Sequence, residues 1–381
     1  MSDHNTFLEM RQIYLNRHAW TSQQKSLNKI PRVGFICRLT PVELILASRA
    51  IPVELFGERK QPLSAGAYME SNVCPFARNI LDDALIGRYG YLDAVIVPHS
   101  CDVVTKIIDF WKAYVQTPPV YQIWIPHVVS DHAVAGLKQE LYRMAEWFTR
   151  TLGLDISSQS LRTAIQVINT SRRLLRQLHR GCQEGKVQGS EFLAAALSRG
   201  IIAPEQWNQM VAGIVETLND GKMGTSAVRL LLSAAAMEDF QVIDTVEKLG
   251  GSVVLHEYCD GYRSCRADIL EEGDPWLQVA SHYVRETLCP RFYQPGLRLE
   301  LVREMVSTTS VDGAIAYALA NCDCYQFEEM ALTETLEGLG IPTISLHTNY
   351  EAQQNEQMFT RLEAFFEIVQ GGSKTWQRQC Q

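Results

Sequence analysis

The sequence has no long hydrophobic run and no excess of positive charge. Its longest apolar stretch, residues 230–237, is far shorter than the roughly 20 residues that a membrane helix needs. The chain opens without the basic, apolar and small-residue segments of a secretion signal. Lys and Arg total 35 against 43 Asp and Glu, so the net charge of −8 gives no basic field for general nucleic-acid binding. We therefore expect a cytoplasmic protein that binds neither membranes nor nucleic acid.

Several catalytic motifs are also missing. The sequence contains no phosphate-binding P-loop, no GxGxxG with an acidic partner, no GxSxG and no HExxH. Nucleotide-binding loops, hydrolase triads and zinc-protease sites therefore find no support, and any ATP that drives this protein must bind to another protein. No CxxC pair occurs, which argues against zinc ribbons and thioredoxin chemistry.

The composition is that of a globular protein with more than one domain. A chain of 381 residues suggests two or three domains, and 46% hydrophobic with 20% charged residues is typical of folded proteins. Short apolar runs alternate with helical patterns at both ends of the chain, which predicts α/β domains with parallel sheets of the flavodoxin or Rossmann type. The predicted units are an N-terminal helical extension (1–30), a first α/β domain (31–130), a helical segment (131–223) and a second α/β domain with a C-terminal helix (224–381).

Strands and helices alternate in the same order in the two predicted α/β domains. In the first domain we expect strands at 32–37, 51–57, 92–102 and 120–126, and helices at 40–50 and 76–85. Thr40 is the expected N-cap of the first of these helices, with Pro41 at its first position. A further helix is expected at 7–16, and residues 219–226 form the expected boundary into the second α/β domain.

An internal match is the most informative feature. Residues 92–102 and 311–323 each contain an Asp, an apolar strand and a Cys-Asp pair at the strand exit, which indicates two related domains. Ligands of such sheets bind beyond the carboxyl ends of the strands. Cys101 and Cys322 lie at such ends, so both thiols are expected to face one cleft.

Ten cysteines in 381 residues are the one compositional oddity. Cys74 lies in the loop before the helix predicted at 76–85, with Pro75 well suited to its first turn. A helix N-terminus favours the thiolate form. Cys74, Cys101 and Cys322 therefore make a candidate three-thiolate site, of a kind that suits iron–sulfur clusters, zinc or copper(I). Taken singly, each of them also fits a buried packing role. The weaker candidates are Cys37, for which packing is favoured, Cys259, Cys289 and Cys324; Cys182 and Cys380 are expected to be incidental.

Histidines follow several predicted strands. His99 and His127 end strands of the first domain, and His347 ends the last strand of the second. Most histidines at such positions are structural. We take His99 and His347 as the catalytic candidates.

Six segments in order resemble the 2-hydroxyacyl-CoA dehydratase and benzoyl-CoA reductase family. They span about residues 33–369 and read GFICRLTPVELILASRAIPVEL, SNVCPFARN, PHSCD, HEYCDGYR, VDGAIAYALANCD and RLEAFFEIV. The resemblance implies two flavodoxin-like domains and a [4Fe–4S] cluster held by Cys74, Cys101 and Cys322. It also implies pairing with a homologous iron–sulfur subunit, a separate ATP-hydrolysing iron–sulfur activator, and one-electron reduction of an acyl-CoA thioester that leads to dehydration or ring reduction.

The sequence departs from the family pattern at two places. The chain has HTNY at 347–350 where the family often has the acidic ETDY, and Cys324 is an additional thiol.

Two alternative functions remain open. Some similar proteins are homodimers that hold a double-cubane [8Fe–9S] cluster and reduce small molecules. Here the thiolates for such a cluster would come from Cys37, Cys74, Cys101, Cys259, Cys289 and Cys322. The other alternative is a non-catalytic subunit that carries electrons or acts as a scaffold.

Overall fold

Two four-stranded parallel sheets organise the chain. The computed structural model describes residues 3–58, 64–115, 117–218, 228–294, 296–350 and 353–379. The first sheet has the order β2-β1-β3-β4 and the second the order β6-β5-β7-β8, so both repeat one topology. The strands are β1 (Arg32–Phe35), β2 (Ile51–Glu54), β3 (Ala94–Pro98), β4 (Val120–Ile123), β5 (Val228–Ala234), β6 (Gly251–Glu257), β7 (Gly313–Leu319) and β8 (Thr343–Thr348). The expectation of two related parallel α/β folds is confirmed.

The central strands are almost entirely buried because helices cover both faces of each sheet. Every residue of β1, β3 and β7 is buried, as expected for strands of a covered parallel sheet. In each sheet the chain order reverses between the two central strands, β1 and β3 in the first and β5 and β7 in the second. Crevices that bind ligands form at such points, beyond the carboxyl ends of the strands.

The N-terminal half differs from expectation at two helices. Where one helix was expected at 7–16, the structure has α1 (Asp3–Leu15) and α2 (Arg17–Asn28). The prediction that Thr40 caps the next helix is wrong: α3 (Val42–Ala47) begins after Pro41, and the Thr40 hydroxyl instead donates to the carbonyl of Ile36 at 3.1 Å. The other helical elements of the first domain are η1 (Ala65–Ala67), α4 (Pro75–Leu85), α5 (Asp102–Phe110) and the π-helical turn η2 (Trp111–Val115).

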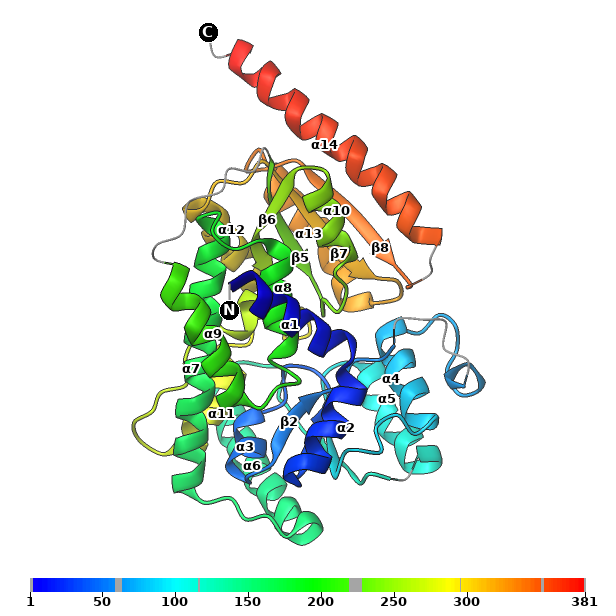
Figure 1. Cartoon of the computed structure of the whole chain (residues 1–381), viewed down its shortest axis with the longest axis vertical. Helices are drawn as coiled ribbons and strands as arrows, with labels where there is room; N and C mark the ends of the chain where they lie inside the picture. The colour runs from blue at the N-terminus through cyan, green and yellow to red at the C-terminus, as the bar shows by residue number, and fades with distance from the viewer. Residues whose placement is uncertain are drawn as a thin grey trace.

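The helical segment runs beside both sheets (Figure 1). It comprises α6 (Asp131–Leu152), α7 (Ser158–Gln183), α8 (Gly189–Ser198) and α9 (Pro204–Leu218). The long helix α7 contacts α3 of the first domain and β6 of the second, so it connects the two. Residues 219–226, the expected boundary, lie within 219–227, outside the described residues.

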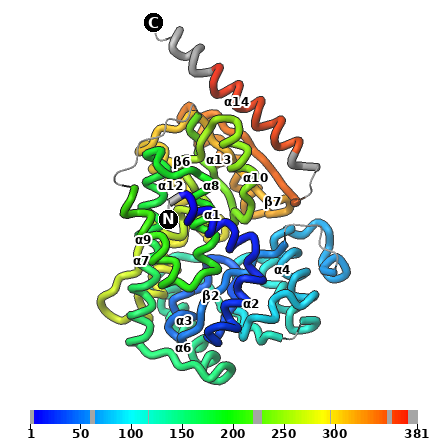
Figure 2. The backbone as a smooth tube through the Cα atoms, in the orientation of Figure 1, coloured from blue at the N-terminus to red at the C-terminus, as the bar shows by residue number. Residues whose placement is uncertain are grey.

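Two helices in the second half were not anticipated. They are α11 (Pro275–Arg285) and α12 (Leu297–Thr308); the remaining elements are α10 (Gln241–Lys248), η3 (Tyr262–Ser264), α13 (Asp323–Glu337) and α14 (Gln353–Gln379). Helix α14 lies along the second sheet and α10 (Figure 2), with Leu362, Phe365 and Phe366 buried in the core. The start of α11 had a readable signal, since Asp274 caps the helix and Pro275 occupies its first position. This helix packs against α6 and α7, so a segment from the second half helps to cover the first sheet.

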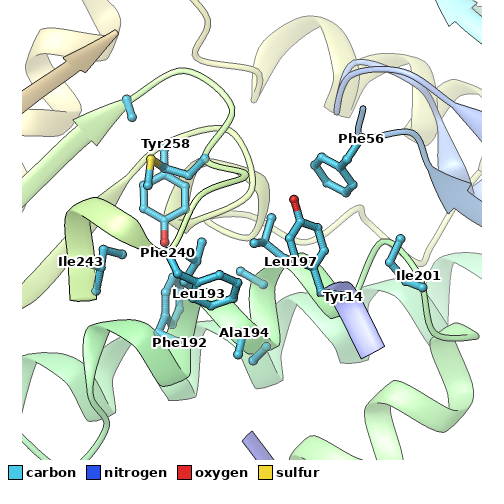
Figure 3. Close-up of a cluster of buried hydrophobic side chains, with 14 of the residues drawn as sticks. Tyr14, Phe56, Phe192, Leu193, Ala194, Leu197, Ile201, Phe240, Ile243 and Tyr258 are labelled. Atoms are coloured by element: carbon cyan, nitrogen blue, oxygen red, sulfur yellow. The ribbon is translucent and has the colours of Figure 1, made fainter. Parts of the chain in front are cut away.

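One hydrophobic core runs through both domains. Its side chains come from the N-terminal helices, the first sheet, the helical segment and the second sheet. Figure 3 shows Tyr14 of α1 between Phe56 of the first domain and the cluster around Phe192 and Phe240. The Tyr14 ring lies 5.3 Å from the Phe56 ring and 6.1 Å from the Phe240 ring, both in edge-on arrangements. The N-terminal extension is therefore part of the core.

No helix in the described part of the chain combines the length and the apolar character needed to cross a membrane.

Candidate functional site

Three cysteines occupy the N-cap positions of three helices. Cys74 precedes α4, Cys101 lies between β3 and α5, and Cys322 lies between β7 and α13. None of these side chains makes the hydrogen bond by which a residue caps its own helix. Because Cys101 and Cys322 follow equivalent strands of the two sheets, the repeat places them at matching positions. Each thiol lies where the positive end of a helix dipole stabilises a thiolate.

The three thiols line one cavity of about 150 Å³ between the two domains. Cys74 and Cys101 come from the first domain and Cys322 from the second. Much of the wall is apolar and consists of Phe76, Ala77, Val103, Val104, Ala235, Ala236 and Leu319. The structure thus brings together the three residues proposed from the sequence, in a site with a largely apolar wall.

Cys74 and Cys322 act on each other's ionisation. Interaction with Cys74 is the main cause that lowers the pKa of Cys322 to about 6; the positive charge of Arg291 contributes to this shift, and burial opposes it. The same interaction raises the pKa of Cys74. Of the two thiols, Cys322 therefore ionises more easily. Cys101 is close enough to act electrostatically on this pair.

A second group of thiols adjoins the first. Cys37 and Cys259 line the same cavity and also a neighbouring one of about 100 Å³, where Cys289 joins them. Burial raises the pKa of Cys37 and of Cys259. The backbone of Cys37 has φ of 70°, in the left-handed region that non-glycine residues seldom adopt. Cys324 also lines the larger cavity. All the weaker candidates of the sequence analysis therefore lie at this centre.

The remaining cysteines lie elsewhere. Cys182 is buried in α7, and Cys265 is buried with its thiol directed at the carbonyls of Gly261 and Tyr262. Cys380 lies outside the described residues. Nine cysteines of the described chain are free thiols.

A buried ion cluster joins the two domains beside the thiols, and sequence reasoning missed it. Arg38, next to Cys37, donates from Nε to Asp260 of the second domain at 2.7 Å and also pairs with Glu54 at the end of β2. All three side chains line the larger cavity. The helical segment meets them at Gly200, whose carbonyl accepts from the Glu54 backbone N–H at 2.7 Å. Both domains and the helical segment thus meet at this point.

Arg291 is a second residue that the sequence analysis did not single out. It follows Cys289 by two residues and lines both cavities. Its Nη1 donates to the Cys289 sulfur at 3.3 Å, and its charge acts on Cys37 and Cys101 as well. A buried Arg near several sulfurs has no sequence signature, because the fold alone brings these residues together.

The histidine candidates lie outside the two cavities. The His99 ring stacks on Trp124, with ring centroids 4.2 Å apart, and the His99 carbonyl contacts the His127 ring nitrogen at 2.9 Å. His347 is exposed and contacts Glu329 at 2.6 Å. Neither His99 nor His347 is among the residues that line the cavities, and their catalytic roles stay predictions.

A single metal ion finds no ready-made site here. Among the residues between 3 and 379 that the structure describes, no group of three or more His, Cys, Asp and Glu side chains is arranged to hold one ion. Cys74, Cys101 and Cys322 instead line one cavity, each from the start of a different helix.

Comparison with known proteins places the chain in a family. Its relatives include a putative dehydratase subunit of Escherichia coli, 25% identical over 355 residues that cover 89% of this chain and 92% of the relative. They also include the beta subunit of (R)-phenyllactyl-CoA dehydratase of Clostridium sporogenes, 23% identical with 97% and 98% covered, and a subunit of benzoyl-CoA reductase of Thauera aromatica, 22% identical with 82% and 84% covered. The model of the 2-hydroxyglutaryl-CoA dehydratase D-component family matches residues 37–369. This chain belongs to that family, which confirms the resemblance seen in the sequence.

Proposed function

We propose that this chain is an iron–sulfur subunit of a 2-hydroxyacyl-CoA dehydratase or of an aromatic acyl-CoA reductase. The observation that carries the proposal is the convergence of Cys74, Cys101 and Cys322 on one enclosed cavity. The family match and the names of the relatives, which are subunits of dehydratases and of a reductase, support it.

The residues present fit a [4Fe–4S] cluster. Cubane clusters are held by cysteine thiolates, and their sulfur ligands bind different irons, so these ligands need not converge on one point as the ligands of a single ion do. Cys74, Cys101 and Cys322 are free thiols at the positive ends of three helices. When bound, the cluster would supply a low-potential electron to an acyl-CoA thioester.

The rest of the site would prepare the thiols for this role. Phe76, Val103 and Leu319 give the cavity an apolar wall, and electrostatic interactions are stronger in apolar surroundings than in water. Arg38, paired with Glu54 and Asp260, holds the first domain against the second. Because the thiols come from both domains, this contact sets the separation between Cys101 and Cys322.

We further propose two protein partners and a cytoplasmic location. The first partner is a homologous iron–sulfur subunit or a second copy of this chain; three of the relatives are beta subunits by name. The second is a separate ATP-hydrolysing iron–sulfur activator, since the sequence has no P-loop. The isolated chain should therefore not hydrolyse ATP, and robust hydrolysis would contradict this part of the proposal.

A specific observation favours a second candidate. Cys37, Cys259 and Cys289 surround a cavity that shares part of its wall with the first. Together with Cys74, Cys101 and Cys322 they would provide thiolates for a double-cubane [8Fe–9S] cluster in a homodimeric reductase of small molecules.

Iron and sulfide counts per chain, measured anaerobically together with the oligomeric state, test these functions. About four irons support the single cluster, and about eight support the double cluster. A well-folded chain that takes up no iron would contradict both and leave the scaffold role. A structure with bound acyl-CoA tests the substrate: an acyl group seated far from all three thiols would overturn the proposed chemistry.

A further inference from the structure

Arg291 lies on a segment that bridges the two domains. The backbone N–H of Tyr293 donates to the carbonyl of His127 at 2.7 Å, and the Phe292 ring lies 5.6 Å from the His127 ring. These contacts attach the segment to the strand exits of the first domain. On the other side, the Arg291 guanidinium lies over the ring of Tyr325 in α13, 5.8 Å from its centroid. Arg291 is thus fixed from both sides at the wall common to the two cavities.

The buried charge of Arg291 has no carboxylate partner among the residues that the structure describes. Its Nη1 contacts the sulfur of Cys289, and its Nε is buried without a hydrogen-bond acceptor. Other buried arginines nearby are paired with acids: Arg38 with Glu54 and Asp260, Arg263 and Arg298 with Glu257. A buried cation without a counter-charge is strongly unfavourable. The charge of Arg291 therefore falls on the thiols around it, among them Cys289 and Cys101, which can carry negative charge as thiolates.

We propose that Arg291 is a positioning residue that provides the counter-charge for an anionic thiolate-ligated cluster in this centre. The inference rests on the proposed function and holds for either cluster type, because Arg291 lines both cavities. Hydrogen bonds to the sulfurs of a cluster and the charge around it set its reduction potential, and a nearby positive charge raises it. Arg291 therefore stabilises the bound cluster and favours its electron-rich state.

The test compares full-length wild type with Arg291→Gln, Arg291→Lys and the matched control Arg285→Gln. Arg285 is on the same stretch of chain but pairs with the exposed Asp131 and lines neither thiol cavity. Each protein is reconstituted anaerobically with iron and sulfide, and iron content and midpoint potential are measured. Arg291→Gln should bind less iron and have a more negative potential, Arg291→Lys should recover most of the iron, and Arg285→Gln should match wild type.

A melting measurement on the metal-free proteins separates this role from a structural one. Without the cluster, burying the charge of Arg291 costs free energy that a neutral glutamine avoids. Metal-free Arg291→Gln should therefore melt at the same temperature as wild type or higher. Wild-type iron content and potential in Arg291→Gln would overturn the inference while leaving the proposed function intact. A metal-free Arg291→Gln that melts clearly below wild type would assign Arg291 to folding instead. Failure of the wild type to take up iron would contradict the proposed function itself.

Discussion

The thiols of Cys74 and Cys322 act on each other, raising the pKa of Cys74 and lowering that of Cys322, although one residue belongs to the first α/β domain and the other to the second. Each residue precedes a helix whose positive end faces the cavity. The pair can exist only while the two domains keep their present separation. The thiol centre and the contact between the domains are therefore one structural feature, and the predictions below test its parts.

Replacing Cys101 with Ser should remove most of the bound iron after anaerobic reconstitution, because the site loses one of its three proposed thiolates. Cys182→Ser is the matched control: Cys182 is buried in α7, and only a weak contact at 3.9 Å links its thiol to the Gln188 carbonyl. Iron content and the visible absorption spectrum of both variants provide the measurement. Full iron in Cys101→Ser would exclude Cys101 as a ligand.

Arg38→Gln should lower the free energy of unfolding by about 3 kcal/mol or more, the usual effect of removing one member of a buried ion pair. The variant leaves Glu54 and Asp260 facing each other without their cation. The control is Arg143→Gln in α6, which removes the ion pair between the exposed Arg143 and Glu140. This change should lower the free energy of unfolding by less than about 1 kcal/mol. Urea denaturation of the metal-free proteins checks both values. Equal effects in the two variants would show that the Arg38 cluster does not hold the domains together.

Gly200→Ala should destabilise the protein by about 1–3 kcal/mol, the range typical of overpacking. A Cβ atom there would lie 2.6 Å from Glu54 Oε2 and 2.7 Å from Glu54 Cβ. The control is Gly213→Ala in α9, where a Cβ meets nothing within 4 Å. That change should stabilise by roughly 0.5–1 kcal/mol, because alanine favours a helix over glycine. Melting temperatures that shift in the same direction for both would contradict the close approach at Gly200.

The unfolding free energy should fall below pH 6.5 because of His179. Burial lowers the pKa of His179 to about 3, while the unfolded chain keeps the ordinary value of 6.5. Below pH 6.5 the unfolded state therefore binds a proton that the folded state does not, and stability decreases as the pH falls toward 3. Between about pH 7.5 and 5.5 this one residue accounts for about 1.4 kcal/mol.

Substitution of His179 isolates this contribution. The His179 ring accepts from the backbone N–H of His256 at 3.2 Å, and His179→Gln keeps an acceptor there without a titrating ring. Its stability should change less with pH than that of wild type, whereas His132→Gln, at an exposed position of α6, should follow wild type. Urea denaturation at about pH 7.5 and about pH 5.5 measures the free energy of unfolding of each variant. An equal change with pH in His179→Gln and wild type would show that His179 does not cause the loss of stability.

The sequence predicted the strands well because both faces of each sheet are covered. Runs such as 313–319 are apolar at every position, so periodicity was not needed to recognise them. The match between the strands before Cys101 and Cys322 also predicted that these thiols share a cleft, because the same topology places equivalent strand ends at equivalent points. Thr40 misled the prediction because its hydroxyl bonds within the loop before α3.

Contacts across the domains could not be predicted from sequence. Arg38 and Asp260 are 222 residues apart, and nothing local to either marks the other as its partner. The same holds for Arg291, whose neighbours come from separate parts of the chain. Such polar residues can be recognised as candidate functional residues only when the fold shows that they are buried and which charges surround them.

The continuous core sets how a substrate can reach the thiols. Opening the centre by a hinge motion would separate Tyr14 and Phe56 from Phe240 and expose apolar surface to water. Such an opening is unfavourable compared with a shift of a loop at the surface. The stretch after α11 that contains Cys289 and Tyr293 forms one wall of the thiol cavities and of a larger surface hollow of about 430 Å³. Entry past this stretch leaves the core around Tyr14 closed, so a substrate of the proposed site would reach the thiols without a hinge motion between the two sheets.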